Sequence, residues 1–112
     1  MGIPHFVSGQ IGSVLPLGAL LMESKTTALF KGPHLEVMRM VLPEGKKIAP
    51  HHVSGPITIH CIEGEVDVGV ESKHQTLRSG DLLYLASNVE HDLLAVTNSS
   101  VLVTVVLMTA VA

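Results

Sequence analysis

Cysteine, aromatic residues and charged side chains are all scarce in this chain of 112 residues. The one cysteine, Cys61, can form neither an internal disulfide nor a cysteine-based zinc site. Tryptophan is missing, and the aromatic residues are two phenylalanines and one tyrosine. The net charge is −3, and no basic run is longer than the pair Lys46 and Lys47. Because nucleic-acid binding needs a positive surface and stacking platforms, we expect no nucleic-acid partner.

Segments that would place the chain in or across a membrane are also lacking. The first residues have neither the basic start nor the apolar stretch of a signal peptide. The apolar tail, residues 101–112, is about half the length needed to cross a bilayer. We therefore expect a cytoplasmic protein with no membrane partner.

Aliphatic residues account for most of the hydrophobic content of the chain. Hydrophobic residues account for 46% of the sequence and charged residues for 15%. Many of the aliphatic side chains are β-branched, which favours strands over helices. Turn-forming residues interrupt the chain so often that the runs between them have strand length, although residues 17–23 fit a helical turn or a strand equally well. This pattern predicts a single all-β domain, a sandwich or a barrel.

Two neighbouring runs show the alternation of a half-buried strand. In residues 64–71, valines alternate with acidic side chains. In the run before it, Ile57, Ile59 and Cys61 share one face. The Glu63–Gly64 step between the runs predicts a tight hairpin.

The run 101–109 is apolar on both faces, so we expect it to be a central strand that is covered on both sides. Edge strands whose two faces are both apolar invite pairing with a second copy of the chain. The sequence therefore predicts a homodimer.

Two stretches resemble the two signature motifs of the cupin superfamily. The first motif of that family runs from a glycine through five residues to a His-x-His pair, and then through a glutamate to a second glycine. Gly45, His51 and Gly64 fall on this pattern at the right spacing. The second motif is matched by Gly80 and by His91, eleven residues further on.

The resemblance extends over residues 28–109 and implies an all-β fold, a single cupin-type double-stranded β-helix, or RmlC-like jelly-roll barrel. On this basis we divide the chain into two parts. Residues 1–25 form an N-terminal arm or strand that packs on the barrel or on a partner, and residues 26–112 form the barrel.

The resemblance also implies a divalent metal, Fe, Mn, Ni or Zn, which the family holds with three histidines and a glutamate. In this chain the second histidine of the pair falls on Val53 and the glutamate falls on Ile57. A shifted alignment puts His52 in the second position but leaves a proline in the first. The candidate ligands are therefore His51, His52 and His91. Adjacent strand residues point to opposite faces, so His51 and His52 can share one ion only if the chain bends there.

The strand face on which a residue lies distinguishes the other candidate site residues. His60 lies on the face opposite Ile57, so we expect it on the outer surface unless a bulge shifts the strand. The residues expected to line a ligand pocket are Ile57, Ile59, Cys61 and Tyr84. For Cys61 the simpler interpretation is a small buried hydrophobe, and for Tyr84 a half-buried aromatic ring with a solvated hydroxyl.

Three functional hypotheses of different classes follow from these residues. The leading hypothesis is a barrel whose mouth binds a small organic ligand, such as a sugar or small acid, with or without a divalent metal. The alternative is a metal-dependent enzyme, by resemblance a dioxygenase, isomerase or lyase acting on a sugar or organic acid. The third is a barrel that acts only as a partner subunit. No catalytic residue is assigned, and three converging imidazoles would favour the enzyme.

Overall fold

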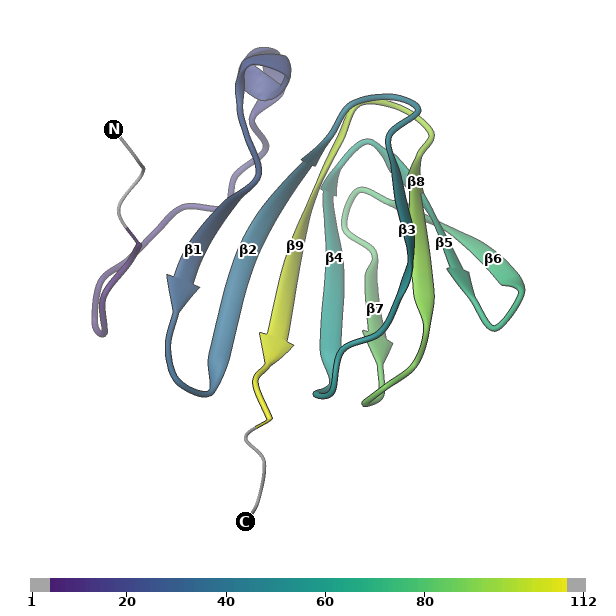
Figure 1. Ribbon diagram of the computed structural model, residues 1–112. Coiled ribbons are helices and arrows are strands. Elements are labelled where there is room, and N and C mark those ends of the chain that lie inside the picture. Colours follow the sequence, from purple (N-terminus) through teal and green to yellow (C-terminus); the bar gives the residue numbers. More distant parts are fainter. Residues whose placement is uncertain (1–4, 109–112) are drawn as a thin grey trace.

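The computed structural model describes residues 5–108, whose regular secondary structure consists of antiparallel strands and one short helix (Figure 1). Residues 18–23, which the sequence left open between helix and strand, form a short 3-10 helix. The elements in chain order are η1 (Gly18–Glu23), β1 (Thr27–Lys31), β2 (Leu35–Leu42), β3 (Lys47–His51), β4 (Ile57–Glu63), β5 (Glu65–Val70), β6 (Lys73–Arg78), β7 (Leu82–Leu85), β8 (His91–Ala95) and β9 (Ser99–Val106).

The strands form two sheets that face each other across the core. One sheet has five strands in the order β1-β2-β9-β4-β7, and the other has four in the order β3-β8-β5-β6. Every pairing between neighbours is antiparallel. The predicted all-β jelly-roll barrel is therefore confirmed. Strand β9 lies between β2 and β4, so the predicted central position of this apolar run is confirmed, although the strand ends at Val106, which is 37% exposed, and residue 109 lies outside the described residues.

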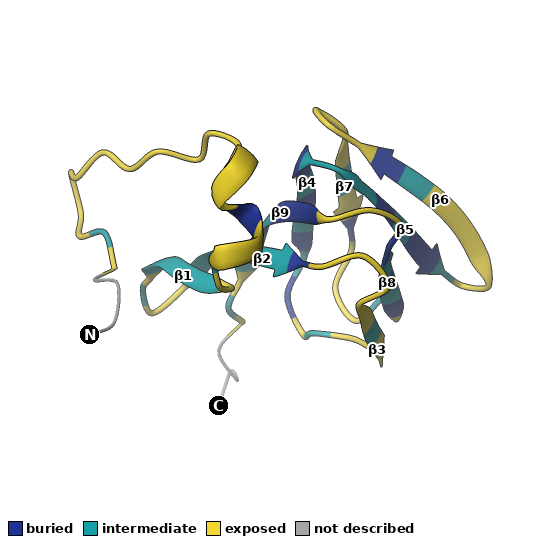
Figure 2. Cartoon of the chain, turned by 90° about the horizontal axis from the view of Figure 1, so that it is seen from above, coloured by how far each residue is buried: buried dark blue, intermediate teal, exposed yellow. Residues whose placement is uncertain are grey.

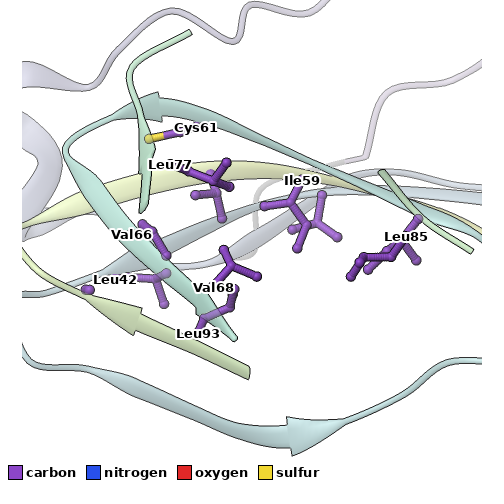
Figure 3. Packing of buried hydrophobic residues seen from close by; sticks show 12 residues of the cluster. Leu42, Ile59, Cys61, Val66, Val68, Leu77, Leu85 and Leu93 are labelled. Atoms are coloured by element: carbon purple, nitrogen blue, oxygen red, sulfur yellow. The ribbon is translucent and has the colours of Figure 1, made fainter. Parts of the chain in front are cut away.

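The core forms where the alternating apolar faces of the two sheets meet. On β4, Ile59 and Cys61 are 1% and 0% exposed, and on β5, Val66 and Val68 are 0% and 1% exposed. Figure 3 shows these side chains in one cluster, with Cys61 at one end and Leu85 at the other. Burying one such aliphatic side chain contributes about 1.5–3 kcal/mol, so this cluster accounts for much of the stability of the barrel.

The predicted hairpin at Glu63–Gly64 is wrong, because β4 and β5 belong to different sheets. The chain crosses from one sheet to the other at Gly64, which has a φ of 85°. A Cβ atom there would overlap the backbone oxygen of Asn98 and the hydroxyl of Ser99. The crossing lets the apolar faces of β4 and β5 oppose each other across the core, which a hairpin within one sheet could not do.

The segment before β1 lies on the outside of the five-stranded sheet. The N–H of Phe6 donates a hydrogen bond of 2.7 Å to the carbonyl of Leu29, and the Arg39 guanidinium donates one of 2.7 Å to the carbonyl of Leu15. Most of this segment is exposed in Figure 2, including Ile11 at 95% and Leu15 at 73%. Within residues 5–108, none of the helical segments is long and apolar enough to cross a membrane.

Candidate ligand-binding site

A cavity of about 500 Å³ lies between the two sheets at one end of the barrel. This is the lower end in Figure 1, where β2, β4 and β8 begin and β3 and β9 end. The wall is mostly aliphatic. Six of its apolar side chains are Met38, Met40, Ile57, Ile59, Leu93 and Val103.

Strand register explains how deep each wall residue lies. Ile57 and Glu36 both pair with Val105, which places these three residues in one row at the mouth. The next inward-facing row contains Ile59. One row further in, Cys61 pairs with Val101, and both are 0% exposed. Met40 also pairs with Val101 and lines the cavity, so the cavity reaches this row on β2 and is closed on the side of Cys61, which does not line it.

His51 and His91 lie side by side on the four-stranded sheet. They are paired in register between β3 and β8, and their ring centroids are 4.4 Å apart with the planes tilted by 53°. Both line the cavity, and His91 is only 4% exposed. The structure thus brings together one histidine from each of the two sequence motifs.

Both imidazoles are oriented in the same way. The Nδ1 of His51 lies 3.0 Å from the carbonyl oxygen of Ala49, and the Nδ1 of His91 lies 3.0 Å from that of Val89. A carbonyl can only accept, so each Nδ1 carries the hydrogen and donates it. In the neutral ring this leaves the lone pair on Nε2, where it can accept a hydrogen bond or bind a cation.

The donor set supplies two of the three protein ligands that catalytic zinc sites use. Across residues 5–108, no three His, Cys, Asp or Glu side chains gather closely enough to hold a metal ion. Ile57 lines the cavity at the position where the resemblance would place a glutamate, and its side chain has no ligand atom. The residues present do not make up a full metal site, and we derive no reaction step through a metal.

Three residues that the sequence placed at the site lie outside this cavity. His52 follows the last residue of β3 and does not line the cavity, so the two adjacent histidines do not both face it. Tyr84 pairs with Thr58 on the outer face of the five-stranded sheet and is 65% exposed. Cys61 faces inward as expected, but it is 0% exposed and does not line the cavity.

The surroundings of the Cys61 thiol also make it unreactive. Burial raises its pKa, and the negative charge of Asp81 raises it further. Its sulfur lies 3.6 Å and 3.5 Å from the carbonyl oxygens of Glu63 and Gly64, to which the thiol donates. Because the thiolate is the reactive form, these surroundings suit a packing residue.

The sequence interpretation missed Glu36, which lines the cavity. Glu36 lies on β2 with the same parity as Met38 and Met40, which also line the wall. The alternation of residues 35–42 could have revealed it, since an acidic residue at an inward-facing position is uncommon. The end of β9 and the residues that follow it add further wall residues, including Leu107.

The family model for the cupin domain matches residues 38–107, which is more than half of the chain. The chain belongs to the cupin domain family. No curated protein matches this cupin.

Solved structures show the same fold at low identity. A cupin superfamily protein from Desulfitobacterium hafniense is 13% identical, with a TM-score of 0.73, and the match covers 86% of this chain and 97% of that one. A conserved protein of unknown function from Streptococcus pyogenes is 17% identical, with a TM-score of 0.74 and coverage of 96% and 98%. A variant of salicylate 1,2-dioxygenase from Pseudoaminobacter salicylatoxidans is 23% identical, with a TM-score of 0.62 and coverage of 65% and 21%. At these identities the likeness is one of fold.

Proposed function

We propose that this cupin binds a small organic ligand in the barrel cavity. One observation supports this proposal above the others: the apolar cavity of about 500 Å³ is bordered by His51 and His91, whose rings are both oriented by backbone carbonyls. Ligand sites in proteins have volumes of about 300–1,000 Å³ and combine an apolar wall with a few oriented polar groups.

The wall and the imidazoles have separate roles in this proposal. The aliphatic wall stabilises a bound ligand by about 25 cal/mol for each Å² of apolar surface removed from water. The two Nε2 atoms give the ligand an orientation, because their rings are held in place before it arrives.

Filling the cavity tests the proposal. Val105→Phe places a larger side chain in the mouth row, whereas Leu102→Phe adds the same kind of side chain to the outer face of the same strand. We expect small-molecule ligands to raise the melting temperature of the wild type and of Leu102→Phe by about 4 °C or more near saturation. Val105→Phe should show no such rise. Equal rises in both variants would place binding outside the cavity.

A metal-dependent enzyme is a second candidate, and the matched anchoring of His51 and His91 favours it. A divalent ion (Fe, Mn, Ni or Zn) on these two imidazoles would take its remaining ligands from water or substrate oxygen, and it would supply Lewis-acid or redox chemistry.

Elemental analysis of protein purified without a histidine tag tests the metal. We expect any retained metal to be lost in His91→Ala and kept in His60→Ala, because His60 lies on the outer face of β4. Equal loss of metal in both variants would contradict the assignment to His91.

We also propose that the chain forms a homodimer through the outer face of the five-stranded sheet. Leu82 and Tyr84 on the edge strand β7 are 66% and 65% exposed. Light scattering after size exclusion should give twice the monomer mass for the wild type. The double variant Leu82→Lys and Tyr84→Lys should give the monomer mass, and a monomeric wild type at tens of micromolar would contradict the proposal.

A further inference from the structure

The cavity contains one acidic side chain that neither of the cupin-like motifs includes. Glu36 lies on the inner face of β2, in the mouth row with Val105, and is partly exposed. His51 and His91 belong to the facing sheet, so the carboxylate and the imidazoles line opposite walls of the same space. A ligand in the cavity would lie between them.

Glu36 has no cationic partner in the described part of the chain. The ion pair found among residues 5–108 joins His74 to Asp67, on the other sheet. Lys31 pairs with Glu36 in register on the edge strand β1, but it is exposed and does not line the cavity. The negative charge of Glu36 is therefore available to a ligand.

The polar side chains of the cavity are nearly all hydrogen-bond acceptors. An ionised carboxylate only accepts. The Nδ1 hydrogens of His51 and His91 are donated to the carbonyls of Ala49 and Val89, so each neutral ring presents an accepting Nε2. Among the described side chains that line the cavity, only Ser54 has a hydroxyl to donate.

We infer that Glu36 makes the cavity selective for an aliphatic ligand that carries a hydrogen-bond donor or a cationic group, an amine or an alcohol. This inference rests on the proposed ligand binding. A carboxylate ligand would meet the like charge of Glu36 in surroundings of lower dielectric than water. A sugar would leave several hydroxyls without partners against the aliphatic wall, and each such buried group costs about 1–3 kcal/mol. Both are disfavoured relative to an amine or an alcohol.

A matched series of ligands tests the selectivity. Hexylamine, 1-hexanol and hexanoate have the same aliphatic body and differ in the polar group. We would measure their affinities by calorimetry or by NMR titration at pH 8. We expect wild type to prefer hexylamine over hexanoate by at least about tenfold, and 1-hexanol to lie between them.

Two substitutions assign the preference to Glu36. The nearly isosteric Glu36→Gln should reduce the ratio of amine to carboxylate affinity by about tenfold while keeping the affinity for 1-hexanol. Glu44→Gln, in the exposed loop after β2, is the matched control and should leave the ratio unchanged.

The outcomes separate this inference from the proposed function. If the three ligands bind wild type and not Val105→Phe, but Glu36→Gln keeps the full preference, the inference is overturned and ligand binding stands. Equal affinities of wild type for amine and carboxylate would overturn it in the same way. If none of the three binds wild type, both the inference and the proposed aliphatic site are overturned.

Discussion

The hydroxyl of Ser100 donates a hydrogen bond of 2.6 Å to the carboxylate of Glu63. The same carboxylate accepts hydrogen bonds of 2.9 Å and 3.0 Å from the backbone N–H groups of Leu17 and Gly18. Ser100 is on β9 and Glu63 ends β4, so one carboxylate joins two neighbouring strands to the start of η1 and the residue before it. Arg39 lies nearby with 6% exposure and donates to Leu15 of the same segment.

This arrangement makes stability depend on pH through Glu63. Burial alone would raise the pKa of its carboxyl group, but the hydrogen bonds from Ser100, Leu17 and Gly18 and the charge of Arg39 outweigh burial, so the pKa lies below 4.5. A lowered pKa in the folded state stabilises the fold above about pH 4.5, and this contribution is lost as pH falls through the folded value.

Glu63→Gln should therefore lower the free energy of unfolding at pH 7 by about 1–3 kcal/mol, measured by urea denaturation. Between pH 4.5 and 3 the variant should lose less further stability than the wild type does. Glu44→Gln, on an exposed loop, is the control and should follow the wild-type curve. Parallel curves for wild type and Glu63→Gln would show that Glu63 does not cause the pH dependence.

The sheet crossing at Gly64 predicts an unequal cost for two glycine substitutions. Gly45 and Gly64 have φ values of 84° and 85°, so alanine is strained at either position. At Gly45 a Cβ atom would meet nothing within 4 Å, whereas at Gly64 it would overlap Ser99 and Asn98. We expect thermal or urea unfolding to show a loss of about 1 kcal/mol for Gly45→Ala and at least twice that for Gly64→Ala. Equal losses would mean that the crossing is not tightly packed.

Cys61 should react slowly with thiol reagents while the chain is folded. Its side chain is 0% exposed, and burial raises the pKa of its thiol. At pH 8 we expect a disulfide reagent to modify it at least about a hundredfold more slowly than in urea. A second thiol introduced on the exposed loop by Ser87→Cys provides the comparison, and reaction of both thiols at the same rate in the folded protein would contradict this expectation.

The adjacent pair His51 and His52 offers a matched test of the site. Both histidines are exposed, but His51 lines the cavity and His52 does not. Loss of one oriented hydrogen bond to a ligand costs about 1 kcal/mol, so His51→Ala should weaken the binding of 1-hexanol by about fivefold. His52→Ala should bind as wild type does. The reverse order, measured by calorimetry, would move the site to the outer side of β3.

Several features of the barrel could be predicted from local pattern alone. Alternation with a period of two identified the inward faces of residues 57–61 and 66–70, because each face is buried as a whole. The apolar run that became β9 was predicted to be central, since a strand without a polar face has to be covered on both sides. The resemblance to the cupin motifs pointed to His91 and left His51 and His52 as alternatives, and the structure pairs His51 with His91.

Strand pairing could not be predicted from the local sequence pattern. The turn at Glu63–Gly64 suits a hairpin when it is read alone, but β4 pairs with β7 and β9 from the end of the chain. Those contacts join residues distant in sequence, so no window of neighbouring residues contains them.

The sequence by itself determined an all-β chain and the inward faces of its strands, while the choice of His51 over His52 as the neighbour of His91 came from the structure. Tertiary structure alone decided the depth of each inward residue: it placed Glu36 at the mouth and Cys61 in the closed core, although both have inward parity. The physical reason is that parity selects a face, whereas depth follows from the register between strands that lie far apart along the chain.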